Sequence, residues 1–240
     1  MHTRLSICVV ILFFTKAVYA EPLFTFAQIR DTPDQMVGAE ILKAVYSKLG
    51  IDIKMLPMPG KRALKESSEG RVDGEVHRIF QVGEDYPTLI RVPTAINYIE
   101  PAVFSKKYRF KVTGCTALDK YSIGIVRGVK HAELCSKGLQ KVQVIDHSIK
   151  MMQLLQAGRI DIAITAKING LVLIKKMAVE SIHVLSPPLS RMLVYHYVHR
   201  RHKDWVPKID KVIIKMQNSG ELENLRQEAI KTLLKNATAN

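Results

Sequence analysis

One short phrase occurs twice in this chain, once in each half. Residues 70–76 read Gly-Arg-Val-Asp-Gly-Glu-Val, and residues 158–164 read Gly-Arg-Ile-Asp-Ile-Ala-Ile. Each copy follows an amphipathic stretch with helical spacing and opens a short β-branched run. The glycine should therefore end a helix in the left-handed conformation, and the run behind it should be a buried strand. Two copies of this helix-to-strand return predict two similar α/β lobes, and paired lobes commonly hold a small molecule between them.

The first twenty residues have the pattern of a secretory signal peptide. Arg4 precedes an almost wholly apolar run at 5–14, and small residues lead up to a cleavage point after Ala20. A membrane-spanning helix needs about 20 apolar residues, roughly twice this run. We therefore predict that residues 1–20 are removed and that the mature protein is periplasmic; an uncleaved anchor is the alternative. Cys8 lies inside the apolar run, away from the cleavage point, so we expect no lipoprotein attachment site.

Two cysteines remain after this segment, Cys115 and Cys135. A pair of cysteines in an exported chain predicts one disulfide, with two buried free thiols as the alternative. A zinc site is not expected, because the spacing contains no Cys-x-x-Cys arm. The eight histidines are scattered along the chain without a metal spacing. We expect neither a metal nor a cofactor.

The chain is strongly basic, with a formal net charge of +14. Removing the signal peptide takes away two basic residues and leaves +12. Such a charge can indicate binding to nucleic acid or to a membrane surface. The Lys and Arg residues look scattered rather than clustered with aromatic residues, so we expect no nucleic acid partner. We interpret the charge as a solvated surface that favours an anionic ligand or an anionic envelope.

Helix and strand signals alternate along the rest of the chain. The first set contains strands at 24–27, 51–55 and 72–76, a helix capped by Asp34 and ended by Gly50, and a second helix that carries Arg62. The second set contains strands at 122–126, 142–145, 160–165 and 182–185, with helices at 129–137, 151–155 and 169–178. This order favours a largely parallel sheet in each set. Extended stretches at 95–105 and 192–199 should carry the chain from one lobe to the other and back, before a helical tail.

The order and spacing of these elements resemble the family 3 extracellular solute-binding proteins, the periplasmic components related to polar amino acid uptake systems. The matching residues are Leu-Leu-Gln-Ala-Gly-Arg-Ile-Asp at 154–161, His-Lys-Asp-Trp-Val-Pro at 202–207 and Asn-Ser-Gly-Glu-Leu at 218–222. The resemblance covers essentially all of the mature chain. It implies a type II periplasmic binding protein fold, in which each lobe is a mixed, mainly parallel sheet flanked by helices and two hinge strands join the lobes. Lobe 1 would then comprise residues 21–100 and 190–240, and lobe 2 residues 101–189.

The chain departs from the amino-acid-binding members of that family at two positions. Those members have Gly-Thr after the first strand of the second lobe, where a hydroxyl and amides receive the ligand carboxylate. This chain has Gly128-Val129 there. They also place an Asp shortly after the second Gly-Arg-x-Asp strand to hold the ligand ammonium, and this chain has Ala166 beside Thr165. An ordinary α-amino acid therefore fits this pattern poorly.

Several residues of lobe 1 are candidates for ligand binding. Arg62 lies near the start of a helix, where free amides and the macrodipole favour anions, and its guanidinium can bind a carboxylate or phosphate through two donors. Glu75 and Arg78 lie at the carboxyl end of a strand, where open α/β sheets bind ligands. Strand alternation places Glu75 and His77 on one face and Arg78 on the other. The alternatives are a surface arginine at position 62 and a structural ion pair of Glu75 with Arg78 or Arg62.

Arg127, Gly128 and Lys130 form the corresponding turn of the second lobe. The glycine would let backbone amides approach an anion closely. Phe26 from the first strand and Tyr98 from the first crossing are expected to pack on the ligand.

Asp73 and Asp161 occupy equivalent positions in the two repeated phrases. A carboxylate that recurs in both lobes is expected to be structural, because it would tie the loop or helix end that precedes each strand. We therefore assign these two residues no catalytic role.

The sequence predicts a monomeric periplasmic binding protein, not an enzyme. It should capture a small polar solute, anionic or amino-acid-like, between its lobes for an ABC-type uptake system, with an inner-membrane ABC permease as partner. The alternative is a ligand-binding sensor or an orphan binding module without a transporter. A second alternative is a small-molecule lyase or dehydratase on the same fold. The sequence contains no Gly-x-Ser-x-Gly, His-Glu-x-x-His or glycine-rich phosphate loop.

Overall fold

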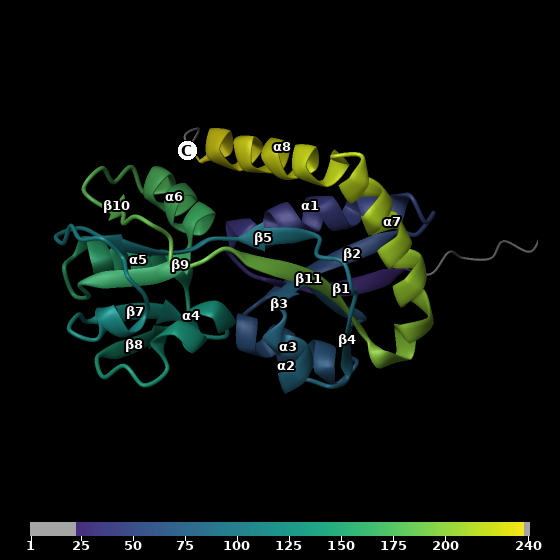
Figure 1. Cartoon of the computed structure of the whole chain (residues 1–240), viewed down its shortest axis with the longest axis horizontal. Coiled ribbons are helices and arrows are strands. Elements are labelled where there is room, and N and C mark those ends of the chain that lie inside the picture. The colour runs from purple at the N-terminus through teal and green to yellow at the C-terminus, as the bar shows by residue number, and fades with distance from the viewer. Residues whose placement is uncertain (1–22, 238–240) are drawn as a thin grey trace, which may run out of the picture.

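The structure, a computed structural model, describes residues 23–237, and the predicted signal peptide with Cys8 lies outside these residues. Its strands form two separate mixed sheets, one of six strands and one of five. The two sheets lie beside each other along the long axis of the molecule (Figure 1). This arrangement confirms the predicted two-lobe α/β fold. None of the described helices is long and apolar enough to cross a membrane.

The first sheet has the strand order β2-β1-β3-β11-β4, and β5 pairs with β11 beside this path. Helix α1 packs on one face of the sheet and α2 and α3 pack on the other (Figure 1). The strands are β1 (Phe24–Ile29), β2 (Ile53–Met58), β3 (Gly74–Ile79), β4 (Leu89–Arg91), β5 (Asn97–Ile99) and β11 (Met192–His199). The helices are α1 (Pro33–Ser47), α2 (Gly60–Ser68), α3 (Gln81–Asp85), the 3₁₀ helix η2 (Arg200–Trp205), α7 (Val206–Asn218) and α8 (Glu221–Asn236).

The second sheet has the order β10-β6-β9-β7-β8. Its strands are β6 (Pro101–Ser105), β7 (Ile123–Val126), β8 (Val142–Ile145), β9 (Ile162–Ala166) and β10 (His183–Val184). The helices of this part are the 3₁₀ helix η1 (Thr116–Leu118), α4 (Lys130–Ser136), α5 (Ser148–Gln156) and α6 (Lys167–Lys176).

One strand in each sheet runs against all the others. In the first sheet this strand is β11, and in the second it is β6. Both strands directly follow a crossing of the chain, one between β5 and β6 and the other between β10 and β11. We therefore propose that lobe 1 comprises residues 21–100 and 190–240 and that lobe 2 comprises residues 101–189, because each of these parts supplies the strands of one sheet.

The two Gly-Arg-x-Asp phrases have the same structural role in both lobes. The glycine that opens each phrase has a positive φ, 73° in the first copy and 69° in the second, as a helix end of this type requires. Asp73 accepts a hydrogen bond from the backbone N–H of Thr25 (2.7 Å), and Asp161 accepts one from that of Ser122 (2.9 Å). Each carboxylate thus ties its loop to the start of the neighbouring strand. Burial raises the pKa of both groups, but these hydrogen bonds lower it below the usual range. The expected structural role is confirmed.

The predicted side-chain alternation along β3 is wrong, because the strand contains a β-bulge. Val76 and His77 together lie opposite the single residue His196 of β11, so the pattern slips by one residue. Glu75 and Arg78 consequently lie on the same side and form an ion pair of 2.9 Å. The imidazole Nδ1 of His196 donates to the carbonyl oxygen of Glu75 (2.8 Å) within the bulge.

Three predicted boundaries shift in the structure. Thr32, not Asp34, precedes the first turn of α1, so the Asp34 side chain is available for other contacts. The strand predicted at 51–55 is β2 (Ile53–Met58) in the structure and includes Pro57, which it tolerates because it is an edge strand. The extended stretch at 95–105 is divided at Glu100 between two sheets, with β5 in the first and β6 in the second.

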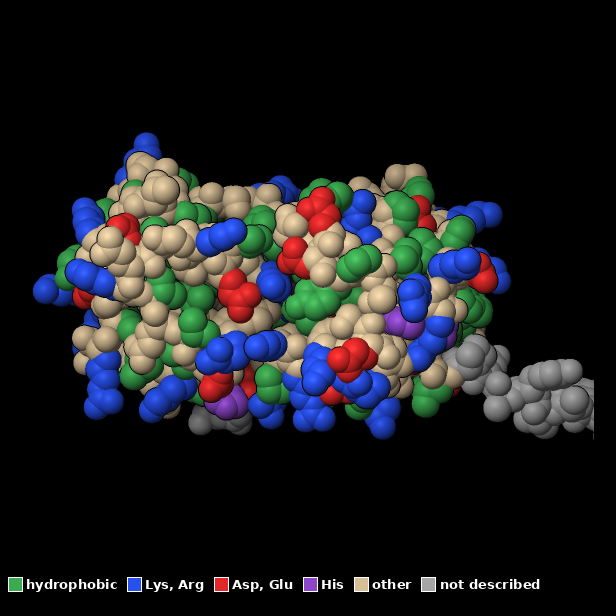
Figure 2. Space-filling model, turned by 90° about the horizontal axis from the view of Figure 1, so that it is seen from below, with side chains coloured by type: hydrophobic (Ala, Val, Ile, Leu, Met, Phe, Trp, Pro, Cys, Tyr) green, Lys and Arg blue, Asp and Glu red, His purple; other side chains and the backbone are tan. Residues whose placement is uncertain are grey.

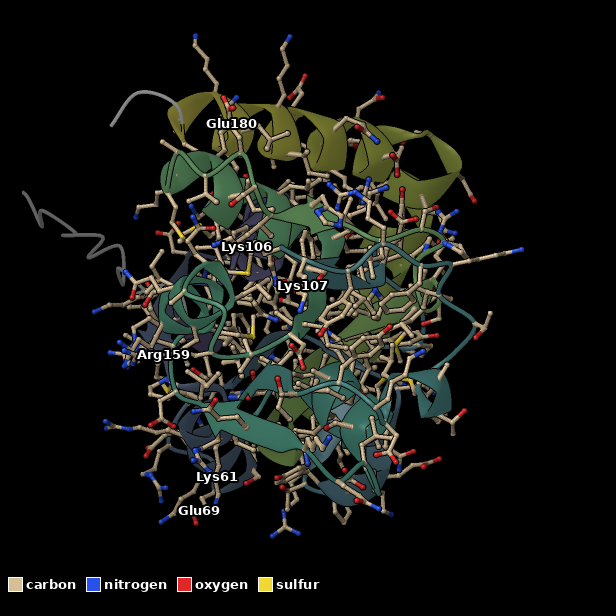
Figure 3. All side chains as sticks on the ribbon, turned by 90° about the vertical axis from the view of Figure 1, so that its left-hand side faces the viewer. Lys61, Glu69, Lys106, Lys107, Arg159 and Glu180 are labelled. Carbon is tan, nitrogen blue, oxygen red and sulfur yellow. A yellow bond between two sulfur atoms is a disulfide. The ribbon has the colours of Figure 1, made fainter. Side chains whose placement is uncertain are left out.

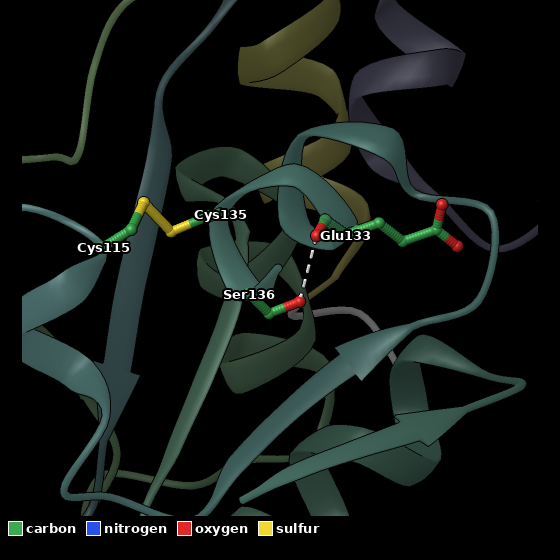
Figure 4. Close-up of a disulfide and its surroundings, with 4 residues drawn as sticks. All are labelled: Cys115, Glu133, Cys135 and Ser136. Atoms are coloured by element: carbon green, nitrogen blue, oxygen red, sulfur yellow. Dashed lines mark hydrogen bonds between the residues drawn. A yellow bond between two sulfur atoms is a disulfide. The ribbon is translucent and has the colours of Figure 1, made fainter. Parts of the chain in front are cut away.

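Cys115 and Cys135 form a disulfide, as predicted, with their Cα atoms 5.3 Å apart. The bond ties the segment before η1 to helix α4 (Figure 4). Replacing both residues by serine should lower the free energy of unfolding by about 3 kcal/mol, since the bond closes a loop of about 20 residues. The melting temperature of the double variant should be about 6–12 °C below that of the parent. Reductant should lower the melting temperature of the parent protein and leave that of the double variant unchanged; an insensitive parent would contradict the prediction.

Candidate functional site

The two lobes meet at two glycines. Gly60 begins helix α2 of lobe 1, and Gly128 lies in the turn between β7 and α4 of lobe 2, with a positive φ of 77°. A methyl group placed on Gly128 would lie 2.3 Å from the backbone nitrogen of Lys61, and one on Gly60 would lie 2.9 Å from the carbonyl oxygen of Gly128. Only residues without a Cβ allow the two backbones to approach so closely.

The guanidinium of Arg78 bridges the lobes next to these glycines. Its Nε donates to Glu75 (2.9 Å), one terminal nitrogen donates to the carbonyl oxygen of Gly60 (3.2 Å) and the other to that of Gly128 (3.2 Å). Both members of the ion pair are buried, and Ser67 donates a further hydrogen bond to Glu75 (2.9 Å). Burial raises the pKa of Glu75 above its usual value, although the charge of Arg78 opposes this.

A second polar contact between the lobes joins Asp34 to Asn169. The Asn169 side chain, from α6 of lobe 2, accepts from the backbone N–H of Asp34 (2.7 Å) and donates to its carboxylate (2.5 Å). The other carboxylate oxygen of Asp34 contacts Nε2 of His77 (3.2 Å). Burial raises the pKa of Asp34, but His77 and Asn169 together lower it below the usual range. All three side chains are buried.

A cavity of about 30 Å³ remains between the lobes, roughly the volume of one water molecule. Arg78, Asp34, His77 and, from lobe 2, Lys130 and His131 contribute to its lining. Nδ1 of His77 and Nε2 of His131 are buried there without a hydrogen-bond partner among the described residues. A solute of ordinary size therefore cannot enter unless the lobes move apart, because binding sites for small molecules typically measure about 300–1,000 Å³.

The structure brings together four of the eight predicted binding residues. Glu75, Arg78 and Gly128 form the contact described above, and Lys130 lies beside it, 3.8 Å from Asp85 of lobe 1. Asp85 is the last residue of α3, so this ion pair also crosses between the lobes.

The other two arginines point elsewhere. Arg62 is largely exposed and lies 3.6 Å from Glu66 on its own helix, which matches the surface-arginine alternative. Arg127 is half exposed and pairs with Asp146 (2.8 Å) within lobe 2. Each of these two arginines thus pairs with a carboxylate of its own lobe.

The predicted role of the Gly128 amide changes in the structure. Its N–H donates to the carboxylate of Glu133 (2.6 Å), five residues further along in α4. The amide expected to receive an anionic ligand therefore already holds an internal carboxylate.

The two predicted aromatic residues lie outside the cavity lining. Phe26 is fully buried in the core of lobe 1, where its ring packs against Tyr46 and His196. The ring of Tyr98 lies between the guanidinium groups of Arg191 (3.7 Å) and Arg226 (3.8 Å). Neither ring takes part in the contacts that join the lobes.

Sequence reasoning missed Asp34, His131 and Asn169 as site residues. All three occupy the first turn of a helix that follows a parallel strand: Asp34 after β1, His131 after β7 and Asn169 after β9. This position is the signal that identifies them, since ligands of open α/β sheets bind at the carboxyl ends of the strands. No group of three metal-ligating side chains occurs within residues 23–237.

His131 should make stability depend on pH. Burial lowers its pKa from 6.5 to about 4. Between these values the unfolded chain binds a proton that the closed protein does not, so stability falls as pH decreases from 6.5 to 4, by at most about 3 kcal/mol. The variant His131→Gln should show a smaller decrease in melting temperature over this pH range than the parent protein. His196, whose pKa burial also lowers to about 4, is present in both proteins and cancels in the comparison; parallel curves would contradict the prediction.

No family model matches the chain. A curated relative, an uncharacterized protein of Shewanella oneidensis, is 26% identical over 224 residues, which cover 89% of this chain and 84% of the relative. A solved histidine kinase sensor domain with similarity to periplasmic binding proteins has a TM-score of 0.75 at 16% identity, covering 87% of this chain and 96% of that one.

Two further solved structures resemble the chain. An amino acid ABC transporter substrate-binding protein of Streptococcus pneumoniae, bound to L-arginine, has a TM-score of 0.73 at 17% identity, covering 88% of this chain and 96% of that one. An ancestral amino acid-binding protein, a precursor of cyclohexadienyl dehydratase, has a TM-score of 0.70 at 11% identity and covers 87% and 95%. The chain therefore has the fold of the periplasmic binding proteins. Within this fold, its neighbours include transporter components and a sensor domain.

Proposed function

We propose that this chain is a periplasmic binding protein that captures a small polar solute between its lobes and delivers it to an inner-membrane ABC permease. The observation that carries the proposal is the set of buried polar side chains between the lobes: Asp34, His77, Arg78, His131 and Asn169. The buried core of a permanent interface is mostly apolar. His77 and His131 each have a ring nitrogen without a hydrogen-bond partner among residues 23–237. Polar groups gathered between two lobes suit an interface that opens to bind a polar molecule.

Opening the lobes would free the groups that a solute needs. Arg78 would lose the Gly128 carbonyl, and Asp34 would lose the amide of Asn169. An anionic group of the solute could then accept hydrogen bonds from Arg78, while a donor or cationic group could bind Asp34. The solute would replace the contacts between the lobes and shift the equilibrium toward a closed, loaded form.

The proposed solute is small, polar and anionic or amino-acid-like. Glu133 occupies the Gly128 amide, and Val129 and Ala166 supply neither a hydroxyl nor a carboxylate. A solute that relies on Arg78 for its anionic group fits these residues better than one that needs the full α-amino acid pattern. The neighbouring transporter protein binds L-arginine, so amino acids belong in the first screen.

The test is a thermal-shift screen of the mature chain with L-arginine, L-glutamine, L-glutamate, succinate, putrescine and phosphate. A compound at a hundredfold excess over its dissociation constant should add about 2.7 kcal/mol, which corresponds to roughly 5–10 °C. Mass spectrometry should recover the bound compound unchanged, whereas a lyase would convert it. A screen in which no member of the panel raises the melting temperature would count against the proposal.

A further inference from the structure

The charge of the chain is distributed unevenly between its lobes. Residues 101–189 contain 14 Lys and Arg against 5 Asp and Glu, a formal charge of +9. Residues 21–100 and 190–240 together contain 20 basic against 17 acidic residues, or +3. Lobe 2 therefore carries most of the excess positive charge of the predicted mature chain. In Figure 2, Lys and Arg side chains lie on both halves of the visible face.

Part of this charge gathers at the end of lobe 2 that is remote from lobe 1. The register of β6 and β9 pairs Pro101 with Ala166 near the hinge and Ser105 with Ile162 at the far end. Basic side chains follow or precede the strands at that far end. We name them the distal basic cluster: Lys106, Lys107, Arg109, Lys111, Lys120 and Arg159. Figure 3 views the molecule from this side and labels Lys106, Lys107 and Arg159.

The charges of the distal basic cluster are not neutralised within the protein. All six side chains are exposed, and none forms an ion pair with a carboxylate of residues 23–237. Lys106 donates to the backbone carbonyl of Gln156 (2.7 Å). Asp161 is near enough to Lys107 for the lysine charge to lower its pKa, but its carboxylate is bound to Ser122. Like charges left so close together repel one another, and an anionic partner would relieve this repulsion.

Aromatic rings underlie the cluster. The ring of Tyr121 packs against those of Tyr108 (4.8 Å) and Phe110 (4.9 Å). The ammonium groups of Lys107 and Lys120 lie over this stack, at 5.3 Å from Tyr108 and 5.2 Å from Tyr121. In the segment Lys-Lys-Tyr-Arg-Phe-Lys at 106–111, the basic side chains are thus exposed and the two aromatic side chains are half-buried.

We propose that the distal basic cluster binds the surface of a membrane that contains anionic phospholipid. Juxtaposed lysines attract anionic lipid headgroups, and aromatic rings are favoured at the membrane–water interface. Four of the six side chains are lysines, which are depleted at protein–protein interfaces, so a lipid surface fits better than an acidic protein. The inference rests on the charge, the exposure and the aromatic contacts of the cluster, and it is independent of the solute. In a periplasmic binding protein, this contact with the membrane would hold the protein close to a permease.

The experiment is co-sedimentation of the mature chain with vesicles of phosphatidylethanolamine and about one quarter phosphatidylglycerol, a weakly anionic surface. Vesicles of phosphatidylcholine alone provide the neutral comparison. Binding should occur only on the anionic vesicles and should disappear between about 50 and 500 mM salt, as screening strengthens. Equal binding to neutral vesicles would overturn the proposal.

Two triple variants distinguish the effect of the distal basic cluster on vesicle binding from the effect of net charge. The first carries Lys106→Glu, Lys107→Glu and Arg159→Glu. The matched control carries Lys54→Glu, Lys211→Glu and Lys231→Glu, three exposed lobe 1 lysines, with the same change in net charge. Each basic residue near such a surface contributes roughly fivefold to binding, so the loss of three should weaken binding by about a hundredfold relative to the control.

Two outcomes would reject the lipid surface as the partner. Equal loss of vesicle binding in both triple variants would mean that net charge, rather than the distal basic cluster, is responsible. Binding of the parent to soluble polyglutamate but not to vesicles would point to an acidic polypeptide instead. Melting temperatures within about 2 °C of the parent should accompany the test, because exposed substitutions usually change stability little.

Discussion

Replacing Gly128 by alanine should prevent the two lobes from closing. The added methyl group would lie 2.3 Å from the backbone nitrogen of Lys61 and 2.5 Å from the carbonyl carbon of Gly60, and neither backbone atom can rotate away. Small-angle scattering should show a larger radius of gyration than that of the parent. A solute that binds the closed form should lose at least about a hundredfold in affinity, because the competent state becomes a small fraction of the population.

Gly158→Ala provides the matched control for this experiment. Gly158 has a similar positive φ, 69° against 77°, but an added methyl group there would have no atom within 4 Å. Both variants should lose about 1–2 kcal/mol of stability from backbone strain. Only Gly128→Ala should change the scattering curve. Superimposable curves for the two variants would show that contact between Gly60 and Gly128 does not limit closure.

Replacing Arg78 by methionine should destabilise the protein by about 3–5 kcal/mol. Glu75 is completely buried, and without the guanidinium it would keep only the hydrogen bond from Ser67. The variant should also fail to bind the solute, because Arg78 supplies the donors proposed for its anionic group. Urea unfolding measures the first effect and isothermal titration calorimetry the second.

A double variant separates these two roles of Arg78. Adding Glu75→Gln to Arg78→Met removes the unpaired buried charge, so most of the lost stability should return. Solute binding should not return, since the guanidinium is still missing. If the double variant bound the solute like the parent, Arg78 would be a structural residue and the proposed binding mode would be wrong.

Features that depend on neighbouring residues were predictable from the sequence. The glycines that open the two repeated phrases end their helices as expected, and Asp73 and Asp161 hold the adjacent strands. The same local signals predicted two α/β lobes. The disulfide was predictable because Cys115 and Cys135 are the two cysteines that follow the predicted signal peptide.

Features that depend on distant residues were not predictable. The bulge in β3 arises from its pairing with β11, more than a hundred residues later, and it reverses the expected side of Arg78. The contact between Asp34 and Asn169 joins residues 135 positions apart. One sequence contains periodicity and turn signals, but it does not contain the register between distant strands.

The position of β11 has a consequence for the order in which the molecule assembles. All five strands of the second sheet come from one continuous segment that ends with β10. The first sheet is interrupted by that segment, and its strand between β3 and β4 is supplied only by residues 192–199. Because synthesis begins at the amino end, lobe 2 can complete its sheet first. In lobe 1, β3 and β4 each keep an unpaired edge until residues 192–199 have been synthesised.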